Sequence, residues 1–198
     1  MTGAEAAGQN LRLFVAIELP EAWLASLTEA QRRLQQRLVA AGVPRLRWVH
    51  PEGIHITLKF LGNVAGERLP SIEEALAATI AEPPGLTLRL QDPGWFLSRR
   101  RVSVIWAGVG GDMAGLSRLA GRIDAACEPL GFTPERRPFA AHLTLARVPE
   151  GVELSPETLA RQLQTLDLAG GPPFRVRHVS LMLSRLGPGG SRYERLAR

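Results

Sequence analysis

Hydrophobic and polar side chains alternate close to the start of the chain. Within residues 12–19, aliphatic side chains occupy every second position, namely Leu13, Val15, Ile17 and Leu19. Successive side chains of a strand point to opposite faces, so this pattern predicts a strand with one buried side. Phe14 lies on the other face. Two explanations stay open for it: the ring stacks on a nucleobase, or it packs beneath a helix.

The period then changes to that of a helix. After Pro20, residues 21–41 repeat large apolar side chains about one helical face apart, and Gly42 follows them. This pattern predicts an amphipathic helix that ends near the glycine. We expect further helices near residues 71–81, 113–130 and 156–166.

The remaining strands are predicted from short runs of aliphatic and β-branched residues. They cover residues 45–49, 54–62, 86–91, 101–109 and 141–147, a long segment at 174–186, and a short one after Gly190. A turn at residues 50–53 and a Pro-Pro-Gly sequence at 83–85 separate some of them. Strands and helices interleave in two similar sets without a linker. We therefore predict an α+β fold of two α/β lobes that share a cleft, with mixed or antiparallel sheets.

Length and composition agree with one bilobal unit. The chain has 198 residues, of which 45% are hydrophobic, enough for a sizeable core. We expect a flexible N-terminus at residues 1–10 and a single domain at 11–198. No apolar run approaches the roughly 20 residues of a membrane span, and the first residues do not resemble a secretory signal. We expect a cytoplasmic monomer in which Cys127 is a buried structural thiol.

The charge is basic and carried almost entirely by arginine. The chain has 24 lysines and arginines against 19 acidic residues, and Lys59 is its single lysine. Guanidinium groups bind phosphate oxygens as a planar fork, so this composition favours an anionic partner. The basic net charge by itself is explained equally well as a property that keeps the protein soluble.

A repeated tetrapeptide carries the chemical information. His55-Ile56-Thr57-Leu58 recurs 87 residues later as His142-Leu143-Thr144-Leu145. In a strand, histidine and threonine fall on one side and the two aliphatic residues on the other. A single histidine in a strand is usually structural, but packing gives no reason for both copies to pair histidine with threonine.

Two histidines across a cleft suit phosphodiester cleavage without a metal. An imidazole has an ordinary pKa near 6.5, so one ring can accept a proton from water while another donates one to a leaving oxygen. Threonine hydroxyls can donate to the non-bridging oxygens. No ligand set with metal spacing surrounds the motifs, and a site from His50 and His55 lacks a third ligand. We predict no cofactor.

The motifs and their surroundings resemble the 2H phosphoesterase superfamily, in particular its RNA 2',3'-cyclic phosphodiesterase branch, historically called 2'-5' RNA ligase. The similar segments are residues 12–20, 47–62, 101–109, 137–147 and 184–196. The resemblance implies a pseudo-twofold bilobal fold, with His55, Thr57, His142 and Thr144 in the catalytic positions. Ala141 stands where the family commonly has proline. The difference removes no functional group and concerns only the local geometry of the strand.

The resemblance also implies a reaction, hydrolysis of a 2',3'-cyclic phosphate on RNA ends or nucleotides to a 2'-phosphomonoester. We assign His142 as base and His55 as acid, although the near symmetry of the motifs does not decide this. The alternatives are 2'-5' end joining, hydrolysis of ADP-ribose cyclic phosphate, and an RNA-end binding protein without turnover.

Further contacts to phosphate or RNA are expected from residues near the motifs and the C-terminus. Arg137 and Arg147 flank the second motif, but Arg147 reaches the face of His142 only if its strand ends or bulges. Arg192 and Tyr193 follow a glycine-rich turn that could bring them over the cleft. The arginines at 99–101 are a solvated loop or, alternatively, contacts to an RNA backbone.

Overall fold

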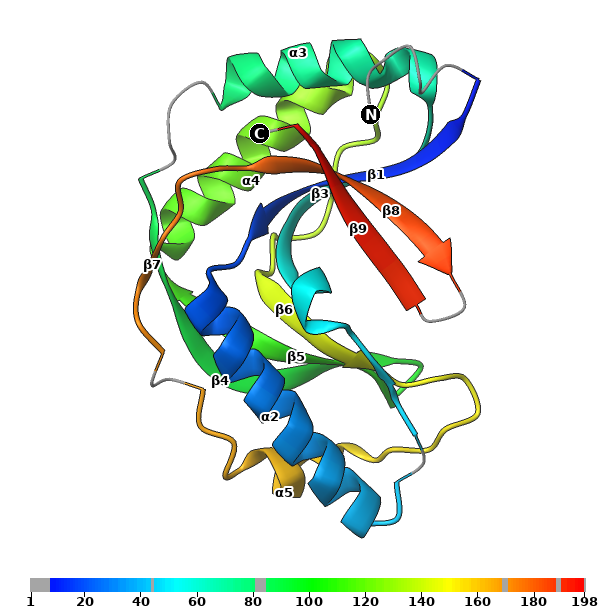
Figure 1. Ribbon diagram of the computed structural model, residues 1–198, viewed down its shortest axis with the longest axis vertical. Coiled ribbons are helices and arrows are strands. Elements are labelled where there is room, and N and C mark those ends of the chain that lie inside the picture. Colours follow the sequence, from blue (N-terminus) through cyan, green and yellow to red (C-terminus); the bar gives the residue numbers. More distant parts are fainter. Residues whose placement is uncertain (1–7, 44, 81–84, 169–170, 188–189, 198) are drawn as a thin grey trace.

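The computed structural model describes residues 8–43, 45–80, 85–168, 171–187 and 190–197 (Figure 1). The expected flexible segment therefore lies mostly outside the described residues, and β1 begins at Asn10. The strands are β1 (Asn10–Glu18), β2 (Arg47–Trp48), β3 (His55–Ala65), β4 (Thr87–Ser98), β5 (Arg101–Gly111), β6 (His142–Arg147), β7 (Phe174–Arg175), β8 (Ser180–Gly187) and β9 (Gly190–Ala197). The α-helices are α2 (Glu21–Ala40), α3 (Leu69–Thr79), α4 (Met113–Cys127) and α5 (Pro156–Leu163).

One strongly curled antiparallel sheet contains all nine strands formed by the described residues. Its order is β7-β4-β5-β6-β3-β1-β8-β9, and β2 pairs with β6 outside this path. The sheet has two halves: β1, β3, β8 and β9 form the first, and β2, β4, β5, β6 and β7 form the second. Among the described residues, a single register pair, Ile56 with Leu143, joins the halves at β3 and β6. The two expected sheets are thus continuous at the centre of the molecule.

Helices α2 and α4 each pack on the half of the sheet that does not contain the strand preceding the helix. Helix α2 follows β1 of the first half but packs on the second, where Trp23 contacts Phe174 at 5.4 Å between ring centroids. Helix α4 follows β5 of the second half but packs on β3 of the first. Figure 1 shows α3 and α4 on one half, and α2 with α5 on the other. This exchange gives the molecule the expected pseudo-twofold, bilobal form.

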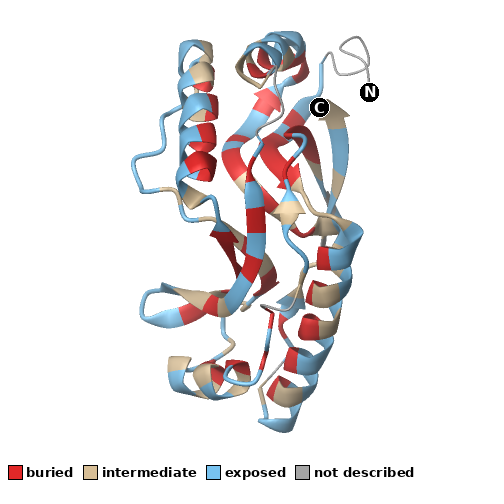
Figure 2. Ribbon diagram, turned by 90° about the vertical axis from the view of Figure 1, so that its left-hand side faces the viewer, coloured by how far each residue is buried: buried red, intermediate tan, exposed pale blue. Residues whose placement is uncertain are grey.

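The sides of the helices that face the sheet are buried (Figure 2). In α2 the buried side chains recur at helical spacing and include Trp23, Leu27 and Leu34, each 0% exposed. Cys127 is also fully buried, as expected, and burial raises the pKa of its thiol. No helix within the described ranges is long and apolar enough to cross a membrane.

The prediction of one long strand at residues 174–186 was wrong. The segment forms two strands in opposite halves, because β7 pairs with β4 whereas β8 pairs with β1. Residues 176–179 carry the chain from one half to the other. The other differences concern bounds: β4 extends to Ser98 through a bulge at Asp92, β2 is only two residues long, and residues 51–53 form a short 3-10 helix.

Candidate active site

The two repeated tetrapeptides lie on neighbouring antiparallel strands at the centre of the sheet. Ile56 and Leu143 face each other across β3 and β6, and both are fully buried in the core. Side chains alternate along each strand, so the flanking residues point to the opposite face of the sheet. These residues are His55, Thr57, His142 and Thr144, all half-buried. Two histidines that are 87 residues apart in sequence thus share one face, which we call the cleft face.

Each imidazole is held in the same way by the backbone. Nδ1 of His55 donates to the carbonyl oxygen of Gly53 at 2.8 Å, and Nδ1 of His142 donates to that of Ala140 at 2.8 Å. A carbonyl oxygen only accepts, so the proton of the neutral ring resides on Nδ1. In both rings Nε2 is therefore the nitrogen that can accept a proton from a bound molecule, or donate one when the ring is charged.

Both imidazoles have a lowered pKa. The pKa of His55 falls from 6.5 to about 4; burial is the main cause, the positive charges of His142 and Arg147 add to it, and the bond to Gly53 and the Glu18 carboxylate oppose it. Burial also lowers the pKa of His142, with a contribution from Arg147, against the bond to Ala140. Neutral rings are therefore favoured at neutral pH, most strongly at His55.

Bulges in both strands return the position five residues after each histidine to the cleft face. In β6, Trp106 pairs with Thr144 but Ile105 pairs with Ala146, which leaves Leu145 as an extra residue. In β3, Ala16 pairs with Thr57 but Val15 pairs with Lys59, which leaves Leu58 extra. An extra residue shifts the alternation by one position. Arg147 consequently lies on the face of His142, and Phe60 occupies the equivalent position after His55.

Aromatic rings surround His55. Its imidazole lies 4.6 Å from the Phe14 ring and 5.0 Å from the Tyr193 ring, between centroids. Phe14 is on the expected face but only 3% exposed, so it supports the imidazole and leaves no open face for a base. Tyr193 is brought to the site by β9, and a Cβ at Gly53 would lie 3.0 Å from its ring. On the other side of the site, Phe96 packs edge-on against His142 at 4.8 Å.

The structure places the other two expected arginines, Arg137 and Arg192, as follows. Arg137 is exposed and pairs with Glu135 at 3.2 Å. Arg192 is adjacent to Tyr193 on β9, so its side chain points to the opposite face. The arginine on the cleft side of β9 is Arg195, which sequence reasoning missed. Its Nε lies 3.1 Å from Oε2 of Glu18, the residue that pairs with His55 across the strands.

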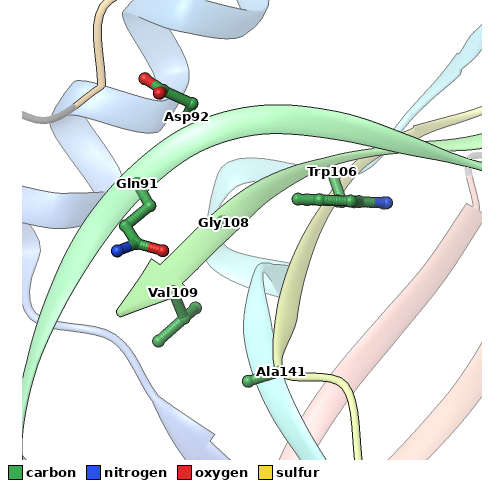
Figure 3. A pocket seen from close by; sticks show the side chains of 6 residues that line it. All are labelled: Gln91, Asp92, Trp106, Gly108, Val109 and Ala141. Carbon is green, nitrogen blue, oxygen red and sulfur yellow. The ribbon is translucent and has the colours of Figure 1, made fainter. Parts of the chain in front are cut away.

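A cavity of about 520 Å³ is lined by β4, β5 and Ala141, the residue that precedes His142 (Figure 3). Its lining residues are Gln91, Asp92, Trp106, Gly108, Val109 and Ala141. Gly108 pairs with His142 across the strands on one side and with Gln91 on the other. A Cβ at Gly108 would lie 3.0 Å from Cβ of Gln91, and a Cβ at Gly110 would lie 2.3 Å from Nε2 of Gln91, so the glutamine side chain rests on two glycines of β5. Sequence analysis did not detect this cavity, because its walls come from three separate segments.

No group of three or more His, Cys, Asp or Glu side chains that could hold a metal occurs in the part of the chain that the structure describes. His50, the second histidine considered for such a site, is exposed and lies 3.9 Å from a carboxylate oxygen of Glu52.

Comparison with known proteins identifies relatives of this chain. A family model described as LigT-like phosphoesterase matches residues 17–106 and 111–193. An RNA 2',3'-cyclic phosphodiesterase of Methanothermobacter thermautotrophicus is 31% identical over 93% of this chain and 95% of its own length. A protein of the same name from Geobacillus stearothermophilus is 39% identical over 61% of this chain, and the match spans 38% of that protein.

Solved structures with the same fold agree with these matches. TT0787 of Thermus thermophilus superimposes with a TM-score of 0.74 and 29% identity, covering 94% of this chain and 95% of that chain. A structure of Escherichia coli LigT complexed with 3'-AMP has a TM-score of 0.65 and 30% identity, covering 95% of this chain and 96% of that one.

Proposed function

The chain belongs to the LigT-like phosphoesterase family, and we propose that it hydrolyses 2',3'-cyclic phosphates on RNA ends or nucleotides to 2'-phosphomonoesters. One observation carries this proposal: two imidazoles, each with Nδ1 bound to a carbonyl, lie on one face of adjacent strands. Relatives named RNA 2',3'-cyclic phosphodiesterase and a LigT structure with bound 3'-AMP support the same class of substrate.

In the proposed reaction, a water molecule attacks phosphorus in line with the 3' oxygen. One imidazole takes the proton of the water through Nε2, the bond between phosphorus and the 3' oxygen breaks, and the other imidazole protonates that oxygen. The phosphate stays on the 2' oxygen. The hydroxyls of Thr57 and Thr144 and the guanidinium of Arg147 donate to the non-bridging oxygens, where negative charge accumulates.

The difference between the two imidazoles supports a division of roles opposite to the sequence-based assignment. A general base must be neutral before it acts, and the pKa of His55 falls to about 4. We therefore propose His55 as the base toward water and His142 as the acid toward the 3' oxygen. Substrate anion near both rings raises their pKa values, which allows His142 to carry a proton in the complex.

The central test uses an oligonucleotide that ends in a 2',3'-cyclic phosphate. We expect a 2'-phosphate product, activity that is unchanged by EDTA, and loss of activity of at least about 100-fold in His55→Ala and in His142→Ala. His50→Ala and His178→Ala are matched controls, because both side chains are exposed and lie outside the motifs. Loss of activity with EDTA, or full activity in either motif variant, would contradict the proposal.

The same experiment separates the alternatives. Joining of ends through a 2'-5' linkage, or turnover of ADP-ribose cyclic phosphate with no turnover of RNA ends, would assign a different substrate to the two histidines. Salt-dependent RNA binding without any product would indicate a binding protein.

We also propose that the protein acts as a monomer in the cytoplasm. Every residue assigned to the reaction comes from one chain, so no second copy is needed to complete the site. Size-exclusion chromatography with light scattering tests this, and a stable dimer at micromolar concentration would contradict it.

A further inference from the structure

Phe60 exposes a large aromatic ring beside the proposed reaction site. It is 66% exposed, and within the described ranges only Val39 and Leu97 are other large hydrophobic side chains with comparable exposure. Val39 lies on α2 and Leu97 near the end of β4. Scattered exposed hydrophobic residues are ordinary, but an aromatic ring next to two candidate catalytic histidines has a specific use to consider.

The bulge at Leu58 determines where this ring points. Without the extra residue, strict alternation would place Phe60 on the core side with Ile56 and Leu58. With it, Phe60 pairs with Phe14 and shares the cleft face with His55 and Thr57. The bulge at Leu145 in β6 places Arg147 on the cleft face in the same way. The backbone therefore has the same bulge after each motif, but the side chain that it places on the cleft face differs. It is the cation Arg147 after the second motif and the aromatic ring of Phe60 after the first.

Contacts to other rings keep Phe60 close to the imidazole. The Phe60 centroid lies 6.3 Å from that of Phe14, which lies 4.6 Å from that of His55, so Phe60 is at most about 11 Å from the imidazole. Phe14 is itself held by Tyr193 at 5.2 Å. A phosphate at the imidazoles and a stacked base on Phe60 fit within that distance, because a nucleotide and the stacking gap together span a similar length.

We propose that the exposed face of Phe60 is a stacking site for the nucleobase of the nucleotide that carries the cyclic phosphate. This inference rests on the function proposed above. Stacking on an aromatic ring is tolerant of sequence, since every base has a π-face. The ring offers no hydrogen-bond donor or acceptor, so we expect all four bases to be accepted and purines, with their larger rings, to bind more tightly than pyrimidines.

The test compares a substrate that has a base with one that lacks it. Adenosine 2',3'-cyclic phosphate and glycerol 1,2-cyclic phosphate present the same five-membered cyclic phosphate, and only the first has a base. In Phe60→Ala we expect KM for the adenosine substrate to rise about tenfold, with kcat within about twofold. For glycerol cyclic phosphate both constants stay near those of the unchanged protein, and Phe60→Trp restores the KM for adenosine.

Val39→Ala is the control for loss of an exposed side chain, and we expect it to change neither constant. The inference is overturned if Phe60→Ala leaves KM for the adenosine substrate unchanged, or if it reduces turnover of both substrates equally. It is also overturned if Gln91→Ala raises that KM while Phe60→Ala does not, which would locate the base in the cavity lined by β4, β5 and Ala141. Failure of the proposed function gives a distinct result, because the unchanged protein then hydrolyses neither substrate.

Discussion

At the scale of single residues, Arg147 connects the two imidazoles electrostatically. Its positive charge lowers the pKa of both His55 and His142, although burial is the larger cause at each. The same charge favours a bound phosphate. In the free protein Arg147 therefore adds to the effect of burial in favouring neutral imidazoles, and a phosphate anion at the site offsets this contribution by its opposite charge.

We predict that replacing Arg147 with glutamine raises the pKa of both imidazoles. A pH titration followed by two-dimensional NMR of the protons bound to the imidazole carbons measures both pKa values. In the unchanged protein the midpoint for His55 is expected at about pH 4. The same variant should lose about 10- to 100-fold in kcat/KM, because a charge-assisted donor to phosphate is gone. Arg137→Gln is the matched control, since that side chain is exposed and paired with Glu135. Unchanged midpoints in Arg147→Gln would show that the guanidinium does not act on the rings.

The lowered pKa of His55 also has a defined effect on stability. Between about pH 4 and 6.5 the folded protein binds fewer protons at this ring than the unfolded chain does. The contribution of His55 to the free energy of unfolding is therefore fully present above pH 6.5. It decreases as the pH falls from 6.5 to about 4.

The residues of the candidate site were most directly predictable where the sequence repeats itself. His55, Thr57, His142 and Thr144 stand out because the tetrapeptide occurs twice. Phe60 lies two positions beyond the repeated tetrapeptide, where the second copy has Arg147, so the repeat gives no signal for it. The signal for the bulges was present, since apolar Leu145 and Ala146 are consecutive and interrupt the alternation. Arg195 was not distinguishable from Arg192 until the register of β9 was known.

At the scale of elements, the segment that leads to His142 is tied to the first half by a buried ion pair. The ammonium group of Lys59, 7% exposed on β3, donates to Asp124 of α4 and to the carbonyl oxygen of Thr133 at 2.6 Å. Asp124 also accepts from the backbone N–H of Glu135 at 3.1 Å. One lysine thus joins a strand, a helix and the loop before β6.

We predict that Asp124→Ala lowers the free energy of unfolding by about 2–3 kcal/mol, because it leaves the Lys59 charge buried without its partner. Partial exposure of Asp124, at 21%, keeps the figure below that of a fully buried pair. Urea denaturation measures the change. The double variant Lys59→Met, Asp124→Ala should lose less than Asp124→Ala alone. A double variant that is the less stable of the two would contradict this account.

The prediction of elements failed where strand pairing, and not local pattern, decides the structure. Residues 174–186 read as one strand because nearly all of them suit a strand. Their apolar positions change phase, however, between Val176 and Val179, where the chain passes from one half of the sheet to the other. Helix α2, by contrast, was predicted to within one residue, because an amphipathic period depends on local spacing.

At the scale of the whole molecule, neither half of the chain contains a complete half of the structure. Helix α2 from the N-terminal part covers the second half of the sheet, and α4 covers the first. Strands β8 and β9 from the C-terminal end complete the first half beside β1. The bilobal form was predictable from the two similar sets of elements, but the exchange of helices has no local signature in the sequence.

We predict that fragments cut between α3 and β4 do not fold separately. Each would expose the apolar side of a helix and an unpaired strand edge. Expressed together, they should assemble into a complex with a cooperative thermal transition by circular dichroism. A cooperative transition in either fragment alone would contradict the prediction.

Among the described residues, one register pair, Ile56 with Leu143, connects the two halves of the sheet and is the pivot for any rocking of one half against the other. When two bodies rock about a pivot, each point moves in proportion to its distance from that pivot. His55 and His142 are the immediate chain neighbours of this pair, whereas Phe60 and the hairpin of β8 and β9 lie farther out. Rocking of the halves would therefore change how far Phe60 and this hairpin lie from the second half of the sheet, while the spacing of the two imidazoles stays nearly constant.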